Sequence, residues 1–368
     1  MAMAATVART STGRTTARRW RGRAGALAAT SALFALAACS SPAPQTPAPT
    51  VTARAEVVAD KQAVPAPEVP PTWPLTGVQG VADPRPAIAV KIENTAVARP
   101  QAGLDQADVV WETIVEFEVS RLVAVFHSKA PEEVGPIRSV RPMDPAIVAP
   151  LNGMLAFSGG QAGILALVAA SGVQQVSHDA GAPGLYRVRG RSAPHNVMGS
   201  LSTWWGTAEA GRTAPPEQFG FARSADRAAA VTGGTPAGTL AFRLSGQSSP
   251  TWTWDAGSGT WLRSEGSSPA TAASGARISA VNVVAVTAPH PSTGYGAQGG
   301  AAVPTYELVG SGDAVVATGG RTIAARWQKD AENQPMRLFL PDGSEAELAP
   351  GNTWVEMIPA GKGSLTVS

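Results

Sequence analysis

The sequence predicts an α+β protein in which a mixed α/β N-terminal domain precedes an all-β C-terminal domain. Between residues 84 and 215, short runs of β-branched and aromatic residues alternate with apolar stretches long enough for helices. After residue 226, short β runs follow one another, separated by turns rich in Gly, Ser, Asp and Pro. That second pattern is typical of a sandwich or a small barrel.

The N-terminal domain is expected to start with strands and continue with helices. The expected strands span 87–92, 108–115, 121–127 and 155–157, and the expected helices span 145–153, 161–170 and 201–210. Ser158-Gly159-Gly160 separates the fourth strand from the helix after it. A strand, a tight glycine turn and a helix form a β-turn-α unit.

The C-terminal domain is expected to consist of short strands joined by hairpins. These strands span 239–244, 251–254, 260–263, 278–287, 305–309, 314–317, 322–327, 337–340 and 353–358. Turns such as Pro341-Asp342-Gly343 place glycine where a hairpin needs a positive φ. Alternate tryptophans such as Trp252 and Trp254 favour core packing over carbohydrate stacking.

Residues 1–38 are typical of an export signal. Six arginines and no acid accompany an apolar stretch from Ala24 to Ala38, which is shorter than the about 20 residues of a membrane span. Cys39, the single cysteine, follows Leu36-Ala37-Ala38. We expect this thiol to carry a diacylglyceryl group, whose two acyl chains include palmitate, and this cysteine to become the new N-terminus. The pair Arg18-Arg19 leaves both Sec and twin-arginine export open.

Residues 39–73 are expected to be a proline-rich tether, because the stretch has too few large apolar side chains to form a core. The sequence therefore predicts a signal peptide over 1–38, an acylated cysteine and tether over 39–73, and domains over 74–225 and 226–368. This organisation places the protein at the cell membrane, anchored by lipid on the extracytoplasmic face.

Charge and metal-ligand counts exclude several classes of partner. Loss of residues 1–38 removes six of the 29 basic residues and none of the 27 acidic ones, which leaves acids in excess. A nucleic-acid partner is therefore not expected. One cysteine committed to lipid and four scattered histidines predict no disulfide, no metal site and no cofactor.

Polar residues gather at the ends of the predicted N-terminal strands, where α/β folds build ligand sites. The candidate ligand-binding residues are Lys91, Glu93, Asn94, Arg99, Arg121, Arg138, Arg141, Ser158, Gly159, Gly160, His195 and Asn196.

These polar blocks resemble a known family, the YerB-like lipoproteins, which pair an N-terminal and a C-terminal YerB domain. The matching stretches are VKIEN, ARPQAGLDQADVVWE, SRLVAVFHS, EEVGPIRSVRPMD, SGG and RSAPHN, followed by LVGSGDAVV, WQKD and PDGSEAELAPGNTWVEMIP. The resemblance covers about residues 74 to 368 and implies a membrane-anchored lipoprotein with two domains. The family's biochemical activity is unassigned. Relatives often carry an Asp and a His where this chain has Glu93 and Thr95.

Arg138 and Arg141 lie three residues apart between Pro136 and Pro142, which stiffen the backbone and orient the guanidinium groups. Such groups bind carboxylate or phosphate through two hydrogen bonds. Two interpretations stay open: the arginines bind an anionic ligand, or they form structural salt bridges with acids. The available acids are Glu112, Glu116, Glu132 and Asp144.

The Ser158-Gly159-Gly160 turn and His195 also have two interpretations each. Backbone amides at the start of a helix can hold an anion, but the turn also fits a plain helix cap by Ser158. His195, in a loop between Pro194 and Asn196, can act as an acid or base, or can hydrogen-bond its own loop.

The sequence favours a non-enzymatic, lipid-anchored envelope protein. Its N-terminal cleft is expected to bind an anionic wall component, a peptide or a protein partner through Arg99, Arg121, Arg138, Arg141 and His195. A second hypothesis is an envelope hydrolase or transferase with Glu112 or Glu93 as base, His195 as acid, and Ser139 or Ser158 as nucleophile. A third is a structural or assembly role. An enzyme requires acid, histidine and serine around one point, whereas a binding protein requires only that the arginines converge.

Overall fold

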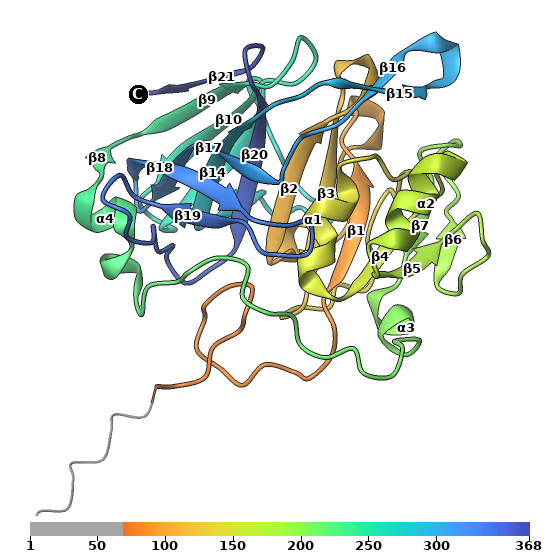
Figure 1. Ribbon diagram of the computed structural model, residues 1–368, viewed down its shortest axis with the longest axis horizontal. Helices are drawn as coiled ribbons and strands as arrows, with labels where there is room; N and C mark the ends of the chain where they lie inside the picture. The colour runs from red at the N-terminus through yellow and green to blue at the C-terminus, as the bar shows by residue number, and fades with distance from the viewer. Residues whose placement is uncertain (1–68) are drawn as a thin grey trace, which may run out of the picture. The chain divides into compact units, whose positions relative to one another are not determined.

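The computed structural model describes residues 69–368, which lie within one compact unit. The predicted signal peptide, Cys39 and most of the predicted tether lie outside these residues. Strands are far more abundant than helices in the described chain (Figure 1). None of the helices in this part combines the length and the apolar character that crossing a membrane would require.

The centre of the fold is a mixed eleven-stranded sheet to which both halves of the chain contribute (Figure 1). Its order is β19-β18-β17-β14-β20-β2-β3-β1-β4-β5, and β8 pairs with β18. The strands from the first half are β1 (Ile88–Glu93), β2 (Val109–Ile114), β3 (Ser120–Phe126), β4 (Met154–Phe157) and β5 (Gln174–Ser177). Those from the second half are β8 (Thr235–Pro236), β14 (Asn282–Ala288), β17 (Gly310–Thr318), β18 (Arg321–Lys329), β19 (Arg337–Phe339) and β20 (Thr353–Pro359).

The two halves meet where β2 and β20 pair in parallel. The register sets Val109 opposite Thr353 and Glu112 opposite Glu356. On its other side β20 also pairs in parallel, with β14. A strand from the end of the chain therefore occupies the middle of the sheet.

A six-stranded sheet packs on one face of the large sheet. Its order is β12-β11-β10-β9-β21, with β13 paired to β11. The strands are β9 (Thr239–Arg243), β10 (Pro250–Asp255), β11 (Thr260–Glu265), β12 (Ser268–Pro269), β13 (Ser279–Ala280) and β21 (Ser364–Val367). Two separate hairpins are formed by β6 (Leu185–Arg187) with β7 (Val197–Gly199) and by β15 (Ser292–Gly296) with β16 (Ala302–Pro304).

Helices cover the other face of the large sheet. They are α1 (Asp144–Val148) and α2 (Ala162–Ala170), together with α4 (Ala229–Gly233) beside the strands of the second half of the chain. The remaining helix, α3 (Leu201–Trp205), packs near β6 and β7 (Figure 1). Alternation along β1 separates the two layers. Val90 and Ile92 join the core that includes the six-stranded sheet, whereas Ala89 joins the core that includes α1 and α2.

Most predicted elements of the first half are present with similar bounds, including β1, β2, β3, β4 and α2. The predicted helix over 201–210 ends earlier, because Gly206 directly follows Trp205. The predicted strand over 305–309 is absent. Thr305 and Glu307 donate backbone N–H groups to the carbonyls of Pro291 and Pro289, and proline has no N–H with which to complete a ladder.

The stricter contrast between a mixed N-terminal domain and an all-β C-terminal sandwich or barrel is not confirmed in that form. The second half contains α4, and six of its strands belong to the shared sheet rather than to a separate sandwich. The division at residues 225 and 226 stays a prediction.

Candidate functional site

A cleft of about 570 Å³ opens at the ends of β1 and β3, on the helix side of the sheet. Its floor and walls come from the strand ends, the β2–β3 turn, the segment before α1, and the loop that precedes β7. The cleft is lined by Glu93, Thr95, Glu116, Phe117, Val119, Ser120, Arg121, Arg138, Ser139, Arg141, Gly160, Gln161, Asp179, Pro194, His195 and Ala297. Six of the candidate residues proposed from the sequence are therefore in one place: Glu93, Arg121, Arg138, Arg141, Gly160 and His195.

Glu116 holds two of the arginines. Arg141 donates from Nε to Glu116 Oε2 over 2.6 Å and from Nη2 to Oε1. Arg121 Nη2 reaches the same Oε1 at 3.3 Å. Three buried charged groups thus form one cluster in which two cations share a single carboxylate.

Burial and the neighbouring charges both shift the pKa values of this cluster. Burial lowers the pKa of Arg121, and the neighbouring charges of Arg141 and Arg138 lower it further, to about 9. Burial raises the pKa of Glu116, but the Arg141 hydrogen bond and the charges of Arg121 and Arg141 outweigh it and hold this pKa at about 2. An anion bound here would relieve the repulsion among the guanidinium groups.

His195 and Glu93 form a second polar contact in the cleft. Both carboxylate oxygens of Glu93 lie 2.9 Å from His195 Nδ1, and Thr95 Oγ1 donates to Glu93 Oε1 over 2.7 Å. A carboxylate at Nδ1 favours the tautomer with its proton on that atom, which leaves Nε2 as the basic nitrogen. Arg138 Nε lies 3.6 Å from Glu93 Oε2, and Arg138 Nη1 donates to the backbone oxygen of Pro194.

The Ser158-Gly159-Gly160 turn contributes less than the sequence suggested. Ser158 does not cap α2, which starts without a side-chain cap; its hydroxyl instead lies 3.3 Å from that of Ser139. A Cβ placed on Gly159 would lie 2.0 Å from Asp179 Oδ2. Since a carboxylate already lies against Gly159, an anion cradle at this glycine is not supported.

Four other candidates lie away from the cleft. Lys91 is fully buried and donates to Asp144 over 2.7 Å, while Asn196 accepts a hydrogen bond from Arg187. Asn94 and Arg99 line a separate cavity of about 250 Å³. The expectation that all four arginines share one cleft is therefore corrected: three do, and Arg99 instead pairs with Glu265 at 2.9 Å.

Glu112 lies on the opposite face of the sheet from His195. Along β2, Val110 and Ile114 face the core of the six-stranded sheet, and Glu112 has the same parity. Glu112 Oε2 is 2.7 Å from Arg263 Nη2, on β11 of that sheet. The hypothesis that Glu112 acts with His195 is therefore wrong on geometric grounds, and Glu93 is the carboxylate that contacts this histidine.

Glu116 and Phe117 are among the cleft residues that were absent from the candidate ligand-binding residues. Glu116 was considered only as one of several acids that pair with arginine, and Phe117 was not singled out. The available signal was their place in the short connection between two predicted strands. Among residues 69–368, no three or more His, Cys, Asp or Glu side chains group in a way that could hold a metal ion.

Comparisons with known proteins match both halves of the chain. The family model "Protein of unknown function (DUF3048) N-terminal domain" matches residues 75–214, and "Protein of unknown function (DUF3048) C-terminal domain" matches residues 240–355. "Putative lipoprotein YerB" from Bacillus subtilis (strain 168) is 48% identical over 71 residues, or 18% of this chain. The match spans 21% of that relative's length.

A solved structure has a similar fold. The crystal structure of the YerB protein from Bacillus subtilis matches with a TM-score of 0.67 and 21% sequence identity. The match covers 80% of this chain and 99% of the crystallised one. At this level of identity the likeness concerns the fold.

Proposed function

Because this chain belongs to the DUF3048 family, whose function is unknown, we propose its role from its cleft: it binds an anionic ligand as a lipid-anchored protein of the cell envelope. The ligand is a wall component, a peptide or a protein partner that presents a carboxylate or a phosphate. The name of the relative, a lipoprotein, and the sequence around Cys39 support the anchor.

One observation carries the binding proposal. Three guanidinium groups converge on the cleft, while its inner wall supplies only the carboxylates of Glu93 and Glu116. The third acid, Asp179, is largely exposed at the rim. Burial is the main cause of the lowered pKa of Arg121, and the charges of Arg141 and Arg138 lower it further. A bound carboxylate or phosphate supplies the missing negative charge and accepts hydrogen bonds from Arg138.

Arg138 is the residue with which to test this proposal. Its side chain is partly exposed and stands outside the Glu116 cluster, so its loss leaves that cluster in place. Binding of inorganic phosphate and of a phosphate-bearing wall polymer to the chain from residue 39 is measured by calorimetry. Arg138→Ala is expected to weaken both by about 1.5–3 kcal/mol, the value of a hydrogen bond to a charged group.

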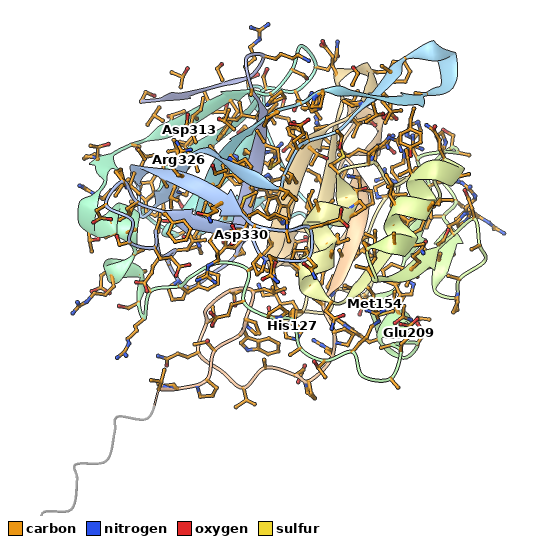
Figure 2. The ribbon with its side chains drawn as sticks, in the orientation of Figure 1. His127, Met154, Glu209, Asp313, Arg326 and Asp330 are labelled. Atoms are coloured by element: carbon orange, nitrogen blue, oxygen red, sulfur yellow. The ribbon has the colours of Figure 1, made fainter. Side chains whose placement is uncertain are left out.

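Arg326→Ala is the matched control, because Arg326 forms an exposed ion pair with Asp313 on β17 and β18. Figure 2 shows these two residues together at the surface. This variant is expected to bind like the wild type. Equal affinity of Arg138→Ala and the wild type would count against the ligand site.

The contact between Glu93 and His195 favours a second candidate function, an envelope hydrolase or transferase. Glu93 would orient His195, Nε2 would accept a proton, and Ser139 lines the same cleft as a possible nucleophile. Incubation with wall fragments, followed by mass spectrometry across the titration range of histidine, tests this function. An enzyme is expected to release a product that is lost in Glu93→Gln or His195→Ala. If the wild type forms no such product, the enzymatic function is eliminated.

The anchor is tested separately. Cys39→Ala is expected to block labelling by radioactive palmitate. In detergent phase partitioning, this variant is expected to move out of the detergent-rich phase, where lipidated proteins collect. Unchanged labelling of this variant would refute lipidation at Cys39, and it would leave the cleft proposal intact.

A further inference from the structure

The turn between β2 and β3 presents an aromatic residue in an unusual backbone conformation. Phe117 has φ 61° and ψ 22°, and Glu118 has φ 59°. Both lie in the left-handed region, which is unfavourable for residues with a Cβ. Phe117 is nevertheless 59% exposed, so burial of its ring does not compensate for the strain.

Contacts on either side of Phe117 impose this conformation. On one side, Glu116 is fixed by Arg121 and Arg141. On the other, Glu118 Oε2 accepts the backbone N–H of Gly246 at 3.1 Å, and the Glu118 carbonyl accepts the Ser245 hydroxyl at 2.6 Å.

The base of the turn is also closed, by a hydrogen bond from the Val115 N–H to the Val119 carbonyl at 2.9 Å. The surroundings thus fix the backbone at Phe117, whereas the ring itself makes little contribution to packing. Exposed residues held under strain in this way concentrate at ligand sites.

The position of Phe117 connects it with the arginines. Phe117 lines the same cleft as Arg121, Arg138 and Arg141, and its neighbour Glu116 contacts two of them. An anion bound by the guanidinium groups therefore carries its next chemical group close to the exposed ring.

We propose that Phe117 is a binding residue whose ring packs against the apolar face of a sugar or aromatic ring attached to the bound anion. This inference rests on the proposed function and narrows it: the ligand is a ring-bearing phosphate or carboxylate rather than a free anion. Aromatic side chains contribute a large contact area and stack or pack edge to face with such rings.

Three probes separate this inference from the proposed function: inorganic phosphate, phenyl phosphate and α-D-glucose 1-phosphate. Wild-type protein is expected to bind at least one ring-bearing phosphate about tenfold more tightly than inorganic phosphate, or about 1.4 kcal/mol. The arm that shows this gain identifies the arene or the sugar as the preferred ring. Phe117→Ala is expected to abolish the gain and to leave the affinity for inorganic phosphate unchanged, while Phe117→Tyr retains the gain.

Each outcome decides a definite point. If inorganic phosphate binds the wild type but neither ring-bearing probe binds more tightly, the role of Phe117 is overturned and the anion cleft stands. A gain that survives in Phe117→Ala overturns the role equally. If no probe binds the wild type, the cleft and the role of Phe117 are both overturned.

The melting temperatures of Phe117 variants distinguish a binding role of the ring from a structural role. Phe117→Gly and Phe117→Ala remove the same ring, but only glycine accepts a positive φ without strain. Phe117→Gly is therefore expected to melt above Phe117→Ala, by about 1–3 °C, and not below the wild type, while lacking the ring-dependent gain in affinity. A melting temperature of Phe117→Gly clearly below that of the wild type would make the ring structural and overturn the proposal.

Discussion

Replacing Arg263 by methionine removes the cation that contacts three carboxylates, of which Glu112 and Glu356 are fully buried and Glu265 is partly exposed. The guanidinium group lies 2.7 Å from Glu112, 2.9 Å from Glu265 and 2.7 Å from Glu356, and its side chain is 2% exposed. These residues lie between the two sheets, where β2 and β20 pair. The predicted effect is a large loss of folding stability.

The magnitude follows from the balance of charge around Arg263. Burial, and then the adjacent Glu112, raise the pKa of Glu356 well above its ordinary value, which lessens the negative charge that Arg263 has to balance. Arg263 is the cation that contacts Glu112, whereas Glu265 contacts both Arg263 and Arg99. Without Arg263, the fully buried Glu112 has no cation. Removal of one partner of a buried pair costs about 3–5 kcal/mol.

Urea unfolding followed by tryptophan fluorescence measures this loss. The Arg263 guanidinium lies 5.5 Å from the ring centre of Trp252 and 4.7 Å from that of Trp354, so the signal reports on the region that changes. The unfolding midpoint of Arg263→Met is expected to fall, with the urea dependence unchanged.

Arg326→Met serves as the control. Its partner Asp313 lies 3.1 Å away, both side chains are mostly exposed, and the pair joins the neighbouring strands β17 and β18 (Figure 2). The control is expected to keep the wild-type midpoint. A loss below about 1 kcal/mol for Arg263→Met, or no difference from the control, would refute the reasoning about the buried charges.

Three further predictions concern titration and packing. The folded state raises the pKa of Glu356 above its unfolded value of 4.5, so the free energy of unfolding of the wild type falls as pH rises above that value. In urea unfolding, the stability of Glu356→Gln relative to the wild type is therefore expected to increase between about pH 4.5 and 8. A stability difference between the two that stays constant over this range would contradict the prediction. Burial lowers the pKa of His127 below 6.5, so the stability that the neutral imidazole contributes is lost as pH falls below that value. Between about pH 7.5 and 5.5, the melting temperature of His127→Gln should therefore drop less than that of the wild type. Equal drops would show that His127 does not titrate in this way. A Cβ on Gly199 would lie 2.2 Å from buried Trp204, so Gly199→Ala is expected to lose about 1–3 kcal/mol of folding stability, measured by thermal unfolding. Gly294→Ala is the neutral control, because a Cβ at Gly294 has open space around it. Equal melting temperatures of the two variants would contradict the packing argument.

The sequence predicted much of the local structure and part of the site. Strand runs such as 87–92 were readable because β-branched residues cluster there, and residues at strand ends did converge on a cleft. The salt-bridge interpretation holds for Arg141, which binds Glu116, whereas ligand binding by Arg138, whose partly exposed side chain lines the cleft, stays a prediction. Local sequence does not separate these roles, because both use the same guanidinium chemistry.

The error at Glu112 has a physical cause. Both faces of β2 are buried, so its sequence lacks the alternation of apolar and polar residues that would show which face each side chain occupies. Glu112 and Thr113 follow the same apolar run, Val109-Val110-Trp111, yet they lie on opposite faces of the sheet. The partner of Glu112 comes from β11, far along the chain, and no local pattern indicates it.

The shared sheet had the weakest signal in the sequence. The run over 353–358 was predicted as a strand, but the strands with which it pairs, β2 and β14, were not identified as its partners. Parallel pairing between distant strands requires no turn between them, so the local sequence carries no signal of it. The strands of the second half were consequently assigned to a sandwich or barrel of their own.

The pairing of β20 with β2 also bears on how the chain is made. A polypeptide emerges with its N-terminus first, so β2 appears some 240 residues before the strand that completes it. During that interval β2 offers an open hydrogen-bonding edge that a neighbouring nascent chain can occupy. Synthesis that stops before residue 353 leaves this edge permanently uncovered, so truncated products are expected to aggregate rather than persist as half-proteins.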